Sequence, residues 1–173
     1  MDNVLRMEFS ALAENEAFAR AAVAAFVMPL DPTVEELTEI KTAVSEAVSN
    51  CVIHGYGLPD VIPGAMSDAV QDDADGGRAV AENSEANDMP VVMMECRSEP
   101  GGRLIIKIED EGAGIEDVER AMEPLFTTGN EEERSGMGFT VMESFMDKLK
   151  VISEKGKGTT VIMTKQLDIL SDI

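Results

Sequence analysis

A chain of 173 residues, 44% of them apolar, has the length and composition of one globular domain rather than of a disordered protein. Its net charge of −20 argues against nucleic acid as a ligand, because an acidic surface repels the phosphate backbone. No apolar run approaches the roughly 18 residues of a membrane span, and the first nine residues lack the features of a signal peptide. We therefore expect a cytoplasmic protein with no membrane partner.

The first third of the chain predicts one strand and two helices. Residues 4–9 alternate apolar with charged side chains, as expected of a strand with one buried face. Residues 14–28 are rich in alanine, and their larger apolar side chains recur near helical spacing. Thr33 and Glu36 fit a capping box at the start of a second helix, whose apolar positions continue towards residue 54.

Residues 57–90 differ in composition from the rest of the chain. They hold eight acidic residues against one basic residue, together with a Gly-Gly pair and three prolines. No periodicity extends beyond a turn or two, and a segment with so few apolar residues and so much charge does not bury a core. We predict a single domain over residues 1–173 with an acidic, disordered insertion at 57–90, apart from a brief helix near 65–70.

Beyond the insertion, the sequence predicts strands, helices and tight turns. In chain order we expect strands at 91–97 and 103–109, helices at 115–122 and 138–146, and strands at 150–153 and 159–165. Because strands and helices do not strictly alternate, the fold class is α+β, with a mixed, mainly antiparallel sheet covered on one face by helices. Cys51 and Cys96 fall inside regular apolar segments and are expected to be buried thiols.

Glu46 and Asn50 form the first candidate polar cluster. Their spacing of four places both side chains on one face of the second helix, offset from its apolar positions. An amide oxygen suits a hard cation such as Mg²⁺, and a carboxylate accepts a proton from a hydroxyl or water. Taken alone, the pair also fits a solvated helix face with no function.

Two glycine-rich segments follow at positions that suit a ligand. Asp110-Glu-Gly-Ala-Gly114 comes directly after a predicted strand, where a carboxylate can accept a hydrogen bond from an exocyclic amine and glycines allow close approach. Ser135-Gly-Met-Gly-Phe139 opens a predicted helix, whose first N–H groups attract an anion. Each segment alone also fits an ordinary loop. The sequence has no Walker-type phosphate loop.

Together and in this order, these three clusters and Gly158-Thr-Thr160 resemble the N, G1, G2 and G3 boxes of the GHKL superfamily, which includes gyrase and histidine kinases. The resemblance implies a Bergerat fold, in which ATP lies between the sheet and a lid.

Longer tracts narrow the resemblance to the anti-sigma-F factors of endospore-forming bacteria. They cover nearly the whole chain outside 57–90 and the tail, and they include Ile53-His-Gly-Tyr56, Pro124-Leu-Phe-Thr-Thr128 and Glu133-Arg-Ser-Gly-Met-Gly-Phe-Thr140. The resemblance implies an anti-sigma factor that is also a serine protein kinase using ATP and Mg²⁺. Its partners would be a sporulation sigma factor, which it inhibits, and an anti-anti-sigma factor, which it phosphorylates on serine. It also implies a homodimer.

The same resemblance implies a role for each candidate residue. Glu46 would be the general base, Asn50 the Mg²⁺ ligand and Asp110 the partner of the adenine amine. Thr160 would support Asp110, and the lid would contain Thr128 and Arg134. The resemblance implies further contacts to the base or the phosphates from Gly112, Gly114, Gly136 and Gly138. Arg20, on the alanine-rich first helix, would anchor a protein partner, although a simple surface arginine also fits the sequence.

Two other functions stay open on the sequence. One is a related kinase that acts on a general-stress sigma factor, and the other is a nucleotide-gated binding module with negligible phosphoryl transfer. The tract 133–140 favours the sporulation branch, and the intact Glu46 favours a kinase.

Overall fold

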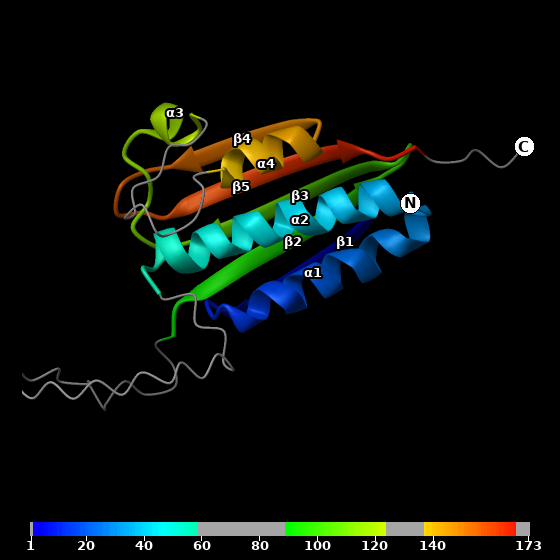
Figure 1. Cartoon of the computed structure of the whole chain (residues 1–173). Coiled ribbons are helices and arrows are strands. Elements are labelled where there is room, and N and C mark those ends of the chain that lie inside the picture. Colours follow the sequence, from blue (N-terminus) through cyan, green and yellow to red (C-terminus); the bar gives the residue numbers. More distant parts are fainter. Residues whose placement is uncertain (1, 59–88, 124–136, 169–173) are drawn as a thin grey trace, which may run out of the picture.

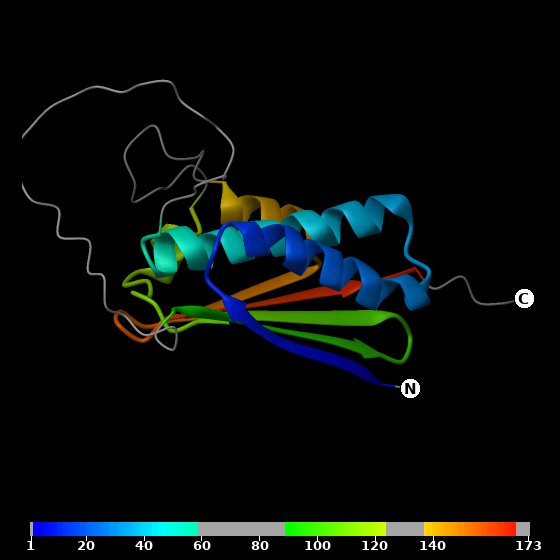
Figure 2. The same ribbon diagram turned by 90° about the horizontal axis from the view of Figure 1, so that it is seen from below.

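The computed structural model describes residues 2–58, 89–123 and 137–168. The strands are β1 (Asn3–Ser10), β2 (Val91–Glu99), β3 (Arg103–Asp110), β4 (Lys148–Ser153) and β5 (Thr159–Gln166). The helices are α1 (Glu14–Val27), α2 (Val34–Asn50), α3 (Val118–Ala121) and α4 (Gly138–Phe145). The strands form one sheet in the order β1-β2-β3-β5-β4, and α1, α2 and α4 lie on one of its faces (Figure 1, Figure 2).

The predicted α+β fold with helices on one face of the sheet is confirmed. All four neighbouring strand pairs are antiparallel, a stricter arrangement than the mixed sheet that the sequence allowed. Short turns join β2 to β3 and β4 to β5, and a short turn forces antiparallel pairing. Helix α3 is shorter than the predicted 115–122, and the brief helix predicted near 65–70 lies outside the described residues.

Helix α2 carries the first polar cluster and is fixed at its start by the predicted capping box. The Glu36 N–H donates to Thr33 Oγ1 at 3.1 Å, and the Thr33 N–H donates to Glu36 Oε2 at 2.7 Å. The α-helix ends at Asn50, earlier than predicted, and Cys51–Gly55 continue as a π-helix. π-Helices are rare, but those that occur are often found at functional sites. The end of α2 is therefore a candidate functional region.

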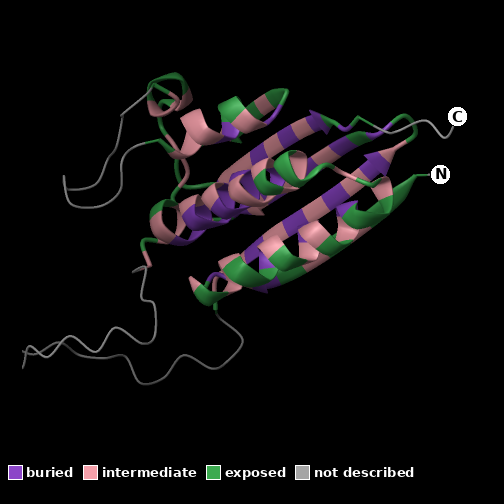
Figure 3. Cartoon of the chain, turned by 45° about the vertical axis from the view of Figure 1, so that its right-hand side comes forward, coloured by how far each residue is buried: buried purple, intermediate pink, exposed green. Residues whose placement is uncertain are grey.

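The core lies between the sheet and the helices. Alternate residues of β2, β3 and β5 are buried against the helix layer (Figure 3), and α2 contributes Ile40, Val44 and Val48, each fully buried. Burying one such side chain contributes about 1.5–3 kcal/mol. Cys51 and Cys96 are both buried free thiols, as predicted. Within the described residues, no helix combines the length and apolar character that crossing a membrane requires.

Candidate functional site

Asp110 is a buried carboxylate at the end of β3, only 4% exposed. Its Oδ1 accepts the Gly112 N–H at 2.9 Å, and the Thr159 N–H and the Cys51 thiol also donate to this carboxylate. Burial raises the pKa of Asp110, although these three hydrogen bonds lower it. Burial and the neighbouring Asp110 charge raise the pKa of Cys51. The site therefore holds an oriented acceptor that is shielded from water.

The loops around Asp110 approach one another so closely that only glycine fits. A Cβ at Gly55 would lie 2.9 Å from Asp110 Oδ1, and one at Gly112 would lie 2.2 Å from the Gly55 carbonyl oxygen. A Cβ at Gly158, where φ is +84°, would lie 2.0 Å from the Asp110 carbonyl oxygen. Gly114 packs in the same way against the Glu154 carbonyl. Three segments thus pack together as one unit: the Cys51–Gly55 π-helix, the 110–114 loop and the start of β5.

Tyr56 joins this unit to the sheet. Its hydroxyl donates to the Val91 carbonyl at 2.7 Å and accepts the Glu111 N–H at 2.9 Å. Burial raises the pKa of the Tyr56 hydroxyl, which therefore stays protonated and available to donate at neutral pH. The sequence analysis did not identify Tyr56 or Cys51 as part of the site. Two signals were available: Tyr56 ends one of the tracts that carry the family resemblance, and Cys51 directly follows Asn50.

Thr160 does not lie where the sequence predicts. In the antiparallel pairing of β3 with β5, Thr159 is opposite Asp110 and Thr160 is opposite Glu109. Successive residues of a strand point to opposite faces, so Thr160 points away from Asp110. Thr159 is the residue beside Asp110, and its hydroxyl forms a 2.9 Å hydrogen bond with Ser153 Oγ. The predicted support by Thr160 is wrong, and the neighbouring threonine occupies that position.

The second half of the site lies where α4 begins against the end of α2. A Cβ at Gly138 would lie 3.2 Å from Glu46 Oε2 and 3.2 Å from Asn50 Nδ2. Glu46 and Asn50 are both half-buried. Glu46 and Asn50 therefore share one face of α2, as predicted, and the structure brings the N-terminus of α4 to that face.

The chemistry of this second half suits a phosphate with Mg²⁺. The first N–H groups of α4 have no partner within their own helix and attract anions. Asn50 supplies a neutral oxygen, and Gly138 leaves beside it a space that a Cβ would fill. No group of three His, Cys, Asp or Glu side chains among the described residues could hold a metal alone. Mg²⁺ usually takes few protein ligands and completes its shell with phosphates and water, so the residues present fit Mg²⁺ bound with a nucleotide.

Comparison with known proteins places this arrangement in a family. Residues 9–165 match the family model of the histidine kinase-like ATPase domain. An anti-sigma F factor of Clostridium perfringens is 48% identical over 171 residues, which cover 97% of this chain and 99% of the relative. One from Clostridium kluyveri is also 48% identical, over 98% of this chain and 99% of the relative. The chain belongs to the anti-sigma F factor family. The family resemblance found in the sequence is therefore confirmed.

A solved structure supports the fold of this family member independently. A crystal structure of the RsbU and RsbW domains of a Mycobacterium tuberculosis protein matches 95% of this chain and 32% of that chain, with a TM-score of 0.55 and 16% sequence identity. At that identity the likeness concerns the fold alone. The shared fold agrees with the histidine kinase-like ATPase domain assigned by the family model.

In this anti-sigma F family member, Arg20 is tied to α2 rather than free on the surface. Arg20 Nη1 donates to Glu16 Oε1 at 2.5 Å and lies 2.8 Å from Ser45 Oγ. Ser45 also bonds to Glu16, and Ser49 Oγ donates to Glu16 Oε2 at 3.1 Å. The Arg20 side chain remains 39% exposed, so a partner can still reach it. Ser45 and Ser49, which bond to Arg20 or Glu16, directly precede Glu46 and Asn50 in the chain.

Three predicted nucleotide contacts, Thr128, Arg134 and Gly136, lie outside the described residues. The predicted lid lies there as well, so these assignments stay predictions.

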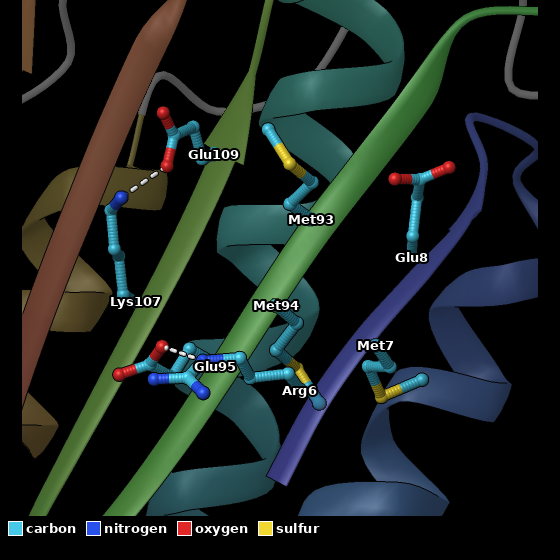
Figure 4. A pocket seen from close by; sticks show the side chains of 8 residues that line it. All are labelled: Arg6, Met7, Glu8, Met93, Met94, Glu95, Lys107 and Glu109. Atoms are coloured by element: carbon cyan, nitrogen blue, oxygen red, sulfur yellow. Dashed lines mark hydrogen bonds and ion pairs between the residues drawn. The ribbon is translucent and has the colours of Figure 1, made fainter.

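A hollow of about 380 Å³ on the sheet face away from the helices is separate from this site (Figure 4). Arg6 donates to Glu95 there at 2.6 Å, and Lys107 pairs with Glu109, so these side chains neutralise one another. Glu109 and Asp110 are adjacent in β3 and therefore point to opposite faces. The hollow consequently has no access to the Asp110 carboxylate through the sheet.

Proposed function

We propose that this chain is an anti-sigma factor and an ATP-dependent serine protein kinase. The observation that carries the proposal is the packing of Gly138 against Glu46 and Asn50, since it combines a helix N-terminus, a carboxylate and an amide in one place. Family membership supports it, because the relatives are anti-sigma F factors and the ATPase domain model matches residues 9–165.

In this proposal the nucleotide spans both halves of the site. The exocyclic amine of adenine donates to the buried Asp110 carboxylate, and Gly112 and Gly114 let the loops pack closely around that carboxylate. The phosphates lie at the N-terminus of α4, where the helix dipole favours negative charge. Asn50 would hold Mg²⁺, which when bound neutralises charge on the transferred phosphoryl group.

Glu46 is the proposed general base. The serine hydroxyl of the substrate protein gives its proton to the Glu46 carboxylate while its oxygen forms a bond to the γ-phosphorus of ATP. The bond from that phosphorus to the β–γ bridging oxygen breaks, and ADP leaves. General-base assistance of this kind is worth about 10²–10⁴ in rate.

The proposed partners follow from the family. The chain would bind a sporulation sigma factor and phosphorylate an anti-anti-sigma factor on serine, with Arg20 anchoring a partner. The net charge of −20 suits a basic partner surface. A homodimer and a cytoplasmic location belong to the same proposal, and sedimentation of the purified protein tests the dimer.

Glu46→Gln tests the kinase assignment. The substitution keeps the side-chain shape but removes the base, so ATP affinity should stay within about twofold while phosphoryl transfer falls about 10²–10⁴-fold. Transfer from γ-labelled ATP to the anti-anti-sigma factor measures the rate, and calorimetry measures affinity. Glu35→Gln, at an exposed position in the first turn of α2, is the matched control and should behave as wild type.

The results also separate the alternatives. Equal transfer rates in Glu46→Gln and wild type would remove the general-base role. Tight ATP and sigma-factor binding by wild type, with no transfer to the antagonist, would instead favour a nucleotide-gated binding module. Binding of a general-stress sigma factor in preference to a sporulation one would move the chain to the other regulatory branch.

A further inference from the structure

Lys165 is a buried lysine that the proposed reaction does not use. It lies on β5, points into the helix layer and is 8% exposed. Its Nζ donates to Glu39 Oε2 at 2.7 Å and to the Phe145 carbonyl at 2.8 Å. An ammonium group is buried only at a large desolvation cost unless it is paired and hydrogen-bonded. These two acceptors meet that requirement.

The two acceptors belong to the two helices that form the second half of the site. Glu39 lies on α2, two turns before Glu46, and Phe145 is the last residue of α4. Helix α4 begins at Gly138, beside Glu46 and Asn50, and its last residue, Phe145, is bonded to Lys165 near the start of α2. Helix α4 therefore runs antiparallel to α2. One lysine thus joins both helices to β5 at the end away from Gly138.

Helix α4 is held by apolar packing as well as by Lys165, and its Phe139 packs against the core. It is eight residues long, and Met142 is its one fully buried residue. Just beyond it, Asp147 Oδ2 accepts the Gln166 N–H at 2.6 Å. A positive charge at a helix C-terminus also stabilises the helix through its dipole. Lys165 thus adds a charged, hydrogen-bonded contact at the C-terminus of α4 to the apolar packing along the helix.

We propose that Lys165 is a positioning residue for the phosphate half of the nucleotide site. By holding α2 and α4 together at one end, it sets where the first N–H groups of α4 lie relative to Asn50 and Glu46 at the other. This inference rests on the proposed function, because it takes those N–H groups to bind phosphate. It predicts an effect on the phosphates of ATP and none on the base, which Asp110 recognises on β3.

Comparing the affinities of adenosine and ATP distinguishes a positioning role of Lys165 from a purely structural one. Adenosine uses only the base half of the site, whereas ATP uses both halves. In Lys165→Met, adenosine affinity should stay within about twofold while ATP affinity with Mg²⁺ falls about tenfold or more, because small displacements of binding groups are costly. Lys165→Arg, which keeps the charge, should recover most of the ATP affinity. Lys150→Met, at an exposed position on β4, is the control.

Glu39→Gln keeps the test decisive if Lys165→Met does not fold. The Glu39 side chain is 25% exposed, so its substitution perturbs the core less, and it should weaken ATP binding about threefold to tenfold with adenosine unchanged. Calorimetry, with displacement titrations for adenosine, gives both affinities. Equal weakening of adenosine and ATP, or no change in either for a folded variant, would overturn the proposal. Failure of the wild type to bind ATP would instead overturn the proposed function.

Discussion

The two halves of the candidate site differ in what defines their shape. Around Asp110, which we propose as the base half, backbone approaches backbone, and a Cβ at Gly112 or Gly158 would overlap a carbonyl oxygen. Around Glu46 and Asn50, which we propose as the phosphate half, the three atoms nearest to a Cβ at Gly138 all belong to side chains, at 3.2–3.3 Å. The base half is held by the sheet and its turns, whereas the phosphate half is a contact between two helices.

This contrast has a physical consequence. Closely packed backbone cannot relax without disrupting strand pairing, so we expect the region around Asp110 to keep the same shape with or without a ligand. A contact between helices adjusts by small sliding or rotation, which is one way in which proteins close around a ligand. We expect the base half to set which nucleotide binds and the phosphate half to respond to the number of phosphates.

The strongest test of the contrast compares two glycines in one turn. Gly158→Ala should lower the free energy of unfolding by about 2–6 kcal/mol, from backbone strain and overlap with the Asp110 carbonyl. Gly156→Ala also has a positive φ, +77°, but its Cβ would meet nothing within 4 Å, so about 1–2 kcal/mol is expected. Chemical denaturation measures both. Equal losses would mean that close backbone packing does not define the base half.

Asp110→Asn should weaken ATP binding by about 1–3 kcal/mol, because the adenine amine loses its acceptor or meets a misoriented donor. The unliganded protein should lose some stability as well, because an amide nitrogen cannot accept the groups that donate to this carboxylate. Inosine triphosphate lacks the amine, so wild type should prefer ATP over it and the variant should not. A variant that still prefers ATP would remove Asp110 from base recognition.

The pH dependence of binding follows from the same carboxylate. Burial raises the pKa of Asp110, so the folded protein takes up this proton at a higher pH than the unfolded chain does. Ionising Asp110 therefore lowers folding stability as pH rises from the unfolded value, about 3.9, to the raised one, with no further loss above it. ATP affinity should show the opposite trend and fall as pH drops through the raised pKa. Asp110→Asn should lack this acid limb.

Tyr56→Phe should have the smallest effect on ATP affinity, and that effect should be confined to the base half. It removes two hydrogen bonds that each contribute about 0.5–1.5 kcal/mol, so we expect a loss of about 1–3 kcal/mol in stability and a few-fold loss in ATP affinity. The Glu111 amide should exchange its hydrogen faster, while the ratio of ATP to ADP affinity stays constant. A changed ratio would show that the two halves are coupled through Tyr56.

The sequence predicted the parts of the site that depend on local pattern. The capping box at Thr33 and Glu36 lies where it was predicted, and β3, predicted over 103–109, extends one residue further to Asp110. The error at Thr160 arose from register, because a shift of one residue in a strand reverses the face. Two features depend on contacts between distant segments, and no spacing in the sequence predicts them. They are the π-helix at Cys51–Gly55 and the hydrogen bonds of Lys165.

The Tyr56 hydroxyl bond to Val91 has a consequence for the length of chain between them. It holds the point where the chain leaves the end of α2 within one side chain of the point where β2 begins. The entropy of closing a loop grows only with the logarithm of its length, at about 0.6 kcal/mol for each doubling. A flexible closure of 30 residues would thus cost only about 2 kcal/mol more than one of four. Segments of very different length can be spliced at this junction for a small free-energy change, which makes it a natural place to graft a reporter domain.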